Sequence, residues 1–174
     1  MKRLILSILT IMTISSMHAT DKVLVAYFSA TGTTKNVAEQ IALATGGELL
    51  AIEPVQPYTS ADLDWHDKQS RSTIEMREEN ARPAIKKTKE NLDAYSVVYI
   101  GFPIWWYVAP RIINTFIETY DLTGKTIIPF ATSGGSDIAG GVAALRKTYP
   151  NLHFEKGKLL NYPSYEEIEK WVKQ

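Results

Sequence analysis

The chain has 174 residues, of which 45% are hydrophobic and 22% charged, a composition typical of one globular domain with a sizeable core. Lysine and arginine together number 19, as do aspartate and glutamate, so the chain is formally neutral, and the sequence has no basic stripe that would suggest nucleic-acid binding. There is no cysteine, which excludes disulfides, thiolate catalysis and cysteine-ligated clusters.

The first 19 residues have the three parts of a secretory signal peptide. Lys2 and Arg3 precede an apolar stretch from Leu4 to Ile14, and small and polar residues follow up to Ala19. The apolar stretch is shorter than a membrane span, although an uncleaved anchor is the alternative interpretation. Cleavage after Ala19 leaves residues 20–174 as one domain with 17 basic and 19 acidic residues, net −2. We therefore expect an exported, periplasmic protein with no membrane segment after cleavage.

Apolar runs of strand length alternate with segments of helical periodicity along the rest of the chain. In chain order the sequence predicts a strand at 23–28, a helix at 35–44, a strand at 48–52, a helix at 62–80, a strand at 97–100, a helix that begins near Pro110, a strand at 126–132, a helix at 142–148, a strand at 158–160 and a helix at 165–173. Such alternation favours a parallel sheet covered by helices on both faces. In a doubly wound sheet of this kind, ligands bind beyond the carboxyl ends of the strands.

The loop after the first strand is rich in hydroxyl groups. It reads Ser29-Ala-Thr31-Gly32-Thr33-Thr34 and leads into a helix. Backbone N–H groups at a helix N-terminus attract an anion, and serine and threonine hydroxyls complete its hydrogen bonds, so the loop predicts a phosphate site. Neither a P-loop nor a dinucleotide fingerprint is present at this position. An ordinary N-capping turn is the alternative interpretation.

The loop after the third strand carries three adjacent aromatic residues, Trp105, Trp106 and Tyr107. Aromatic side chains in a loop beyond a buried strand favour a flat ligand that they can cover. Packing against the neighbouring helix and a surface for a protein partner are the alternatives.

Glycine and serine follow the fourth strand, in the segment Ser133-Gly134-Gly135-Ser136. Glycine allows close approach of the backbone, and free N–H and hydroxyl groups can bind the polar edge of a ring. The same segment could bind phosphate, or serve only as a turn before a helix.

With these three loops in order, residues 22–174 resemble the flavodoxin family. The segment Gly101–Pro110 resembles a bacterial branch with the pattern Gly-aromatic-Pro-Ile-Trp-Trp-x-x-Ala-Pro, and Thr132–Ser136 matches its Thr-Ser-Gly-Gly-Ser. The resemblance implies a flavodoxin-like α/β fold: a doubly wound five-stranded parallel sheet of order 2-1-3-4-5 with helices on both faces. It also implies non-covalently bound FMN, and no long insertion near the fifth strand points to the short-chain type.

The resemblance further implies three groups of FMN-binding residues. Ser29, Thr31, Gly32, Thr33 and Thr34 would surround the phosphate; Pro103, Ile104, Trp105 and Trp106 would line one face of the flavin; Ser133, Gly134, Gly135 and Ser136 would follow the edge of the ring. Residues 133–141 contain no aromatic, whereas flavodoxins often place a second aromatic there. The other face of the ring is therefore expected to be more open.

The main functional prediction is an exported FMN protein that transfers electrons to a redox partner protein or to a small quinone-type acceptor. No catalytic side chain and no metal are expected, because the flavin supplies the chemistry and the three histidines are scattered. The first alternative is an FMN-dependent NAD(P)H or quinone oxidoreductase. The second is a binding module that keeps the fold and has lost tight FMN binding.

Overall fold

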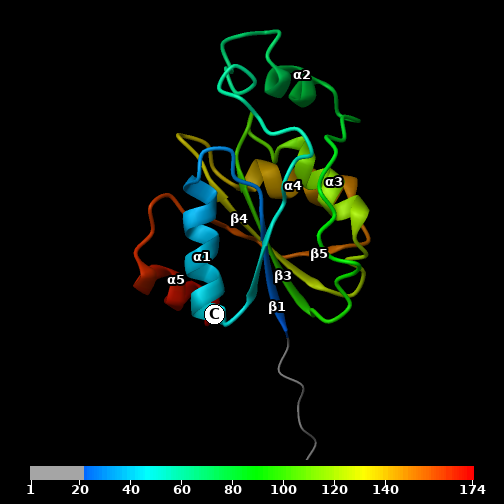
Figure 1. Cartoon of the computed structure of the whole chain (residues 1–174). Coiled ribbons are helices and arrows are strands. Elements are labelled where there is room, and N and C mark those ends of the chain that lie inside the picture. The colour runs from blue at the N-terminus through cyan, green and yellow to red at the C-terminus, as the bar shows by residue number, and fades with distance from the viewer. Residues whose placement is uncertain (1–21) are drawn as a thin grey trace, which may run out of the picture.

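A computed structural model describes residues 22–174 (Figure 1). Its parallel sheet has the order β2-β1-β3-β4-β5, with β6 beside β4, which confirms the predicted doubly wound order. The strands are β1 (Val23–Tyr27), β2 (Glu48–Ala51), β3 (Val97–Pro103), β4 (Thr126–Thr132), β5 (His153–Phe154) and β6 (Lys158–Leu159).

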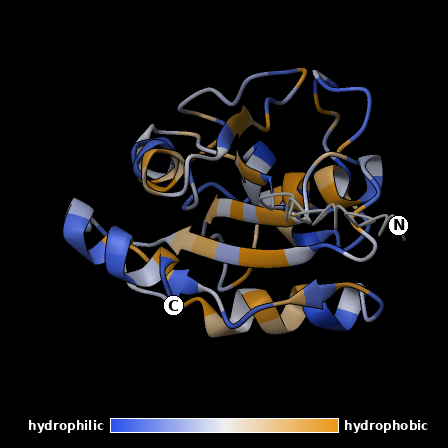
Figure 2. Ribbon diagram, turned by 90° about the horizontal axis from the view of Figure 1, so that it is seen from below, coloured by the Kyte–Doolittle hydropathy of each residue, from blue (hydrophilic) through white to orange (hydrophobic). Residues whose placement is uncertain are grey.

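Helices cover both faces of the sheet. On one face lie α1 (Thr33–Thr45) and α5 (Tyr165–Val172), and on the other α3 (Arg111–Thr119) and α4 (Ala139–Thr148) (Figure 1). The hydrophobic strand residues lie between these layers (Figure 2). The short helix α2 (Arg71–Arg77) sits at the top of Figure 1, beyond the carboxyl ends of the strands.

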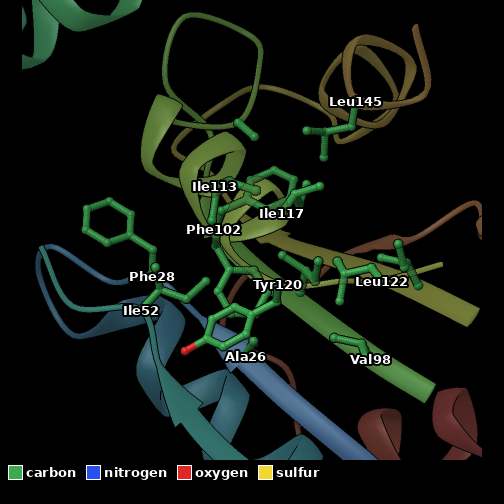
Figure 3. Close-up of a cluster of buried hydrophobic side chains, with 14 of the residues drawn as sticks. Ala26, Phe28, Ile52, Val98, Phe102, Ile113, Ile117, Tyr120, Leu122 and Leu145 are labelled. Atoms are coloured by element: carbon green, nitrogen blue, oxygen red, sulfur yellow. The ribbon is translucent and has the colours of Figure 1, made fainter. Parts of the chain in front are cut away.

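The core divides into two clusters because successive strand residues point to opposite faces. In β1, Leu24 and Ala26 join the cluster under α3 and α4, whereas Val25 and Tyr27 join the cluster under α1 and α5. The larger cluster, shown in part in Figure 3, includes the fully buried ring of Phe102 at the end of β3. Burial on both faces anchors the strand ends from which the loops emerge.

The fifth position of the sheet holds two short segments, where the sequence predicted one strand at 158–160. β5 pairs with the start of β4 and β6 with its end. Between them, Pro129 of β4 has no N–H to donate, while the carbonyls of Ile127 and Ala131 on either side accept from Glu155 and Leu160 at 2.8 Å each. The ladder is therefore interrupted opposite Pro129.

The helix predicted at 62–80 is mostly wrong. Only α2 is helical, and a series of turns precedes it. The carboxylates of Asp64 and Asp67 each accept from a backbone N–H two residues on, at 3.0 and 2.8 Å, and Ser70 then caps α2 through the N–H of Thr73. Short polar side chains that hydrogen-bond to the local backbone compete with helix formation. The longer helix that the spacing of apolar residues predicts therefore does not form before α2.

No helix within residues 22–174 is long and apolar enough to cross a membrane. The predicted signal peptide, residues 1–19, lies outside the described residues.

Candidate functional site

The first loop presents the N-terminus of α1 to solvent. Gly32 is the N-cap and has φ +92°, a left-handed conformation that glycine adopts readily, and its N–H donates to Ser29 Oγ at 3.0 Å. The N–H groups of Thr33, Thr34 and Lys35 belong to the first turn, where no intrahelical acceptor exists. No acidic residue lies in that turn. This positive end of the helix is therefore suited to an anion.

The threonine hydroxyls of this loop divide into two groups. Thr31 is exposed, and its Oγ1 lies 3.4 Å from Thr33 Oγ1. Thr34 is only 1% exposed, and its Oγ1 lies 2.9 Å from the buried Oγ1 of Thr132. The Thr34 hydroxyl thus joins α1 to the end of β4, which leaves Thr31 and Thr33 as the threonine hydroxyls of this loop available to a ligand.

The loop after β3 forms a tight turn. The backbone N–H groups of Trp105 and Val108 donate to each other's carbonyls at 3.0 and 3.1 Å. Between them, Trp106 and Tyr107 have φ values of 46° and 68°, the left-handed pair of a type I′ turn that usually requires asparagine or glycine. The turn leaves Trp106 42% and Tyr107 74% exposed.

The side chain of Trp105 is fixed by packing against other aromatic side chains. Its ring packs edge-on against Phe28 and Tyr58, with centroids 5.5 and 5.4 Å apart. The Tyr58 hydroxyl donates to Glu75 Oε2 at 2.5 Å, and the Arg71 guanidinium lies 4.0 Å from the Tyr58 ring centroid while bonding Glu75 at 2.6 Å. Burial, followed by the bond to Glu75, raises the pKa of Tyr58, so the phenol stays a neutral donor.

The loop after β4 is ordered by Ser133. Its Oγ accepts from the N–H groups of Gly135 at 3.2 Å and Ser136 at 2.8 Å. Its own N–H donates to Asn161 Oδ1 at 2.8 Å. This bond ties the loop to the segment that follows β6.

These loops line a pocket of about 410 Å³ that is open to solvent, which we call the loop cavity. Its walls are Thr31, Thr33, Pro103, Ile104, Trp105, Thr132, Ser133, Gly134, Asn161 and Tyr162. Of the remaining predicted residues, Ser29, Gly32 and Thr34 lie in or beside the first turn of α1, whereas Trp106 and Ser136 line a second cavity. Gly135 is exposed. The volume lies within the range of small-ligand sites.

Two residues that line the loop cavity, Asn161 and Tyr162, are not among those that the sequence predicts. Both follow Leu160 at the carboxyl end of β6, and the position of a loop after a parallel strand was the signal that could have found them. Tyr162 is 89% exposed and has φ 51°. A second aromatic thus reaches the loop cavity from this loop, although residues 133–141 supply none.

The chemistry of the walls fits a ligand with a phosphate and a flat ring. Hydroxyls and helix N–H groups gather at one loop, and the aromatic rings of Trp105 and Tyr162 lie on others. No carboxylate lines the cavity to repel an anion. Within residues 22–174 there is no group of three histidine, aspartate or glutamate side chains that could hold a metal ion.

Comparison with known proteins agrees with this description. A family model described as Flavodoxin matches residues 22–174. The crystal structure of a candidate flavoprotein from Bacteroides eggerthii is 57% identical, with a TM-score of 0.86, and covers 88% of this chain and 97% of that chain. Another, from Bacteroides uniformis, is 52% identical, with a TM-score of 0.86, and covers 88% and 99%.

A more distant structure shares the fold. It is a flavoprotein from Lactobacillus acidophilus in complex with FMN, 22% identical, with a TM-score of 0.69, covering 88% of this chain and 99% of that chain. No curated protein sequence matches this chain.

Proposed function

Because this chain belongs to the flavodoxin family, we propose that it binds FMN non-covalently in the loop cavity and serves in electron transfer. When bound, FMN supplies the redox chemistry, and the protein supplies binding, orientation and electrostatics. The observation that carries the proposal is the convergence of four loops on one cavity beside the open N-terminus of α1. The FMN complex of the distant Lactobacillus structure supports it.

The residues of this chain have separate tasks in the proposal. The first-turn N–H groups of α1 and the hydroxyls of Thr31 and Thr33 would hold the phosphate. Trp105 and Tyr162 would contact the ring, and the backbone around Ser133 and Gly134 would meet its polar edge. No side chain has to act as an acid or a base.

The proposal includes export to the periplasm and, as partner, a redox protein or a small quinone-type acceptor. The signal-peptide pattern of residues 1–19 supports export. Without those residues the chain has net charge −2, so strong electrostatic steering toward a basic partner is not expected. Fractionation of the native host, followed by detection of the protein, tests the location: recovery from the cytoplasm would contradict export.

The phosphate anchor can be tested by comparing FMN with riboflavin, which lacks only the phosphate. We expect FMN to bind at least about 100-fold more tightly, because two charge-assisted hydrogen bonds contribute roughly 3 kcal/mol or more. Titration of flavin with protein, followed by flavin fluorescence, measures both dissociation constants.

A pair of variants locates that anchor. Thr33→Val should weaken FMN binding about tenfold and leave riboflavin binding unchanged, since a hydrogen bond to a charged group is lost. Thr148→Val is the matched control, because Thr148 is an exposed threonine at the end of α4, outside the loop cavity. Equal affinity for FMN and riboflavin would refute the anchor, and a folded protein that binds neither would favour a binding module.

A further inference from the structure

Tyr58, Arg71 and Glu75, in the connection between β2 and β3, form a closed cluster, which we call the Tyr58 cluster. The Glu75 carboxylate accepts from the Arg71 guanidinium through Oε1 at 2.6 Å and from the Tyr58 hydroxyl through Oε2 at 2.5 Å. The Arg71 guanidinium also lies 4.0 Å from the centroid of the Tyr58 ring, so each side chain contacts the other two. A further bond, from Arg71 to the carbonyl of Gln56 at 2.8 Å, ties the cluster to the backbone near Tyr58.

The Tyr58 cluster holds the Tyr58 ring in one position. The side chains of Arg71 and Glu75 are only 22% and 14% exposed, so water competes weakly for their charges. Breaking one contact leaves a half-buried charge with fewer partners, which makes the three contacts mutually dependent. None of the three residues lines the loop cavity, so the cluster does not itself contact a ligand there.

The Tyr58 ring supports two of the loops that line the loop cavity. It packs against Trp105 of the loop after β3, with centroids 5.4 Å apart, and against Phe28, with centroids 5.6 Å apart. Phe28 directly precedes Ser29, where the loop after β1 begins. Phe28 and Trp105 also meet edge-on at 5.5 Å, and of these three rings only that of Trp105 lines the cavity.

We propose that Tyr58, Arg71 and Glu75 are positioning residues, which hold the Trp105 indole in the wall of the loop cavity. The polar contacts fix the Tyr58 ring, and that ring limits the rotation of the indole. The cluster raises flavin affinity without touching the flavin, because an indole already in place loses less conformational entropy when a ligand binds. The effect on the flavin rests on the proposed function, whereas the position of Trp105 in the FMN-free protein does not.

The first test observes Trp105 in the FMN-free protein. The chain has four tryptophans, so labelling with 5-fluorotryptophan gives four ¹⁹F NMR resonances, and Trp105→Leu identifies the one from Trp105. Glu75→Ala removes the acceptor that Tyr58 and Arg71 share and leaves every aromatic ring in the chain. It should move the Trp105 resonance toward its position in the unfolded protein, because the indole samples more orientations. An unmoved Trp105 resonance would overturn the proposal.

The second test measures flavin affinity. Glu75→Ala should raise the dissociation constants of FMN and riboflavin by the same factor, about twofold to tenfold, because both carry the same ring and stacking on an indole contributes about that much. This pattern differs from that of Thr33→Val, which should affect FMN alone. Unchanged affinity for both flavins, even with a lower Tm, would leave the cluster a purely structural role and overturn the proposal.

A second cluster of the same residue types supplies the matched control. Glu118 of α3 accepts from Arg82 at 2.8 Å and from the Tyr149 hydroxyl at 2.7 Å, and none of these three residues lines the loop cavity. Glu118→Ala therefore removes an equivalent pair of bonds and should leave the Trp105 resonance and both dissociation constants unchanged. If it had the same effect as Glu75→Ala, general loosening of the fold would be the cause, which would contradict the proposal.

A double variant shows whether the effect passes through Trp105. In a Trp105→Leu background, Glu75→Ala should weaken neither flavin further, since the side chain that the cluster positions is gone. An equal loss of affinity with and without Trp105 would overturn the proposal. Failure of the parent protein to bind either flavin would refute the proposed function, while the ¹⁹F spectra of the FMN-free protein would still decide whether the Tyr58 cluster positions Trp105.

Discussion

Gly101 lies in β3, near the end of the strand at Pro103, which lines the loop cavity, and replacing Gly101 with alanine should destabilise the protein. A Cβ at this position would stand 2.1, 2.4 and 2.7 Å from three ring carbons of Phe130, whereas ordinary contacts begin near 3.4 Å. Phe130 is completely buried in the neighbouring strand β4, so its ring has little room to move. We expect a loss of about 1–3 kcal/mol, the usual cost of an overpacked core.

The effect appears as a lower midpoint in thermal unfolding. At about 2–4 °C per kcal/mol for a chain of this size, Gly101→Ala should lower Tm by roughly 2–12 °C. In a Phe130→Leu background the clash is relieved, and the alanine should cost less than about 1 kcal/mol, since glycine is itself unfavourable in a strand. The reasoning is refuted if the penalty is the same in both backgrounds, or if Gly101→Ala leaves Tm unchanged.

Three further predictions concern stability. Thr34→Val leaves the Thr132 hydroxyl buried and unpaired, and should lower the free energy of unfolding in urea by about 1–3 kcal/mol. Replacing both threonines with valine should be nearly neutral, and a full penalty in the double variant would contradict this. Tyr107→Gly relieves a left-handed residue at an exposed position and should add about 1 kcal/mol to the free energy of unfolding; a loss would show that φ 68° is not strained. The hydrogen bond from the Arg82 guanidinium lowers the pKa of Glu118 below its usual 4.5, so ionised Glu118 stabilises the fold above that pH, and this stabilisation is lost as the pH falls through the folded pKa. Glu118→Gln should therefore lower Tm more at pH 7 than in acid, and an equal loss of Tm at all pH values would contradict this.

Much of the fold follows from the sequence because its strands are strongly marked. The run from Val23 to Phe28 is apolar throughout, as expected for a strand buried on both faces. Gly46, in the left-handed conformation, caps α1 after Thr45, one residue beyond the predicted end of the helix at 44. The break between β5 and β6 opposite Pro129 is harder to predict from the sequence, because it depends on which side of β4 each backbone group faces. The turns before α2 depend on local side-chain bonds that periodicity does not detect.

The candidate site was predictable as a set of loops and less so as a set of contacts. Three loops were expected together, and the structure brings Thr33, Trp105 and Ser133 to one cavity. The sequence could not show that the Thr34 hydroxyl faces Thr132, since that contact joins residues far apart in the chain. The sequence does not predict Tyr162 as a site residue, because its loop carries no distinctive motif.

The amount of FMN that remains on the protein after gel filtration tests the central claim most directly. Purified protein is incubated with excess FMN, separated from free flavin, and examined by visible absorption and flavin fluorescence, with circular dichroism to show that the chain is folded. The account predicts stoichiometric retention with quenched fluorescence, because Trp105 lines the loop cavity. A folded chain that leaves the column without FMN would contradict it.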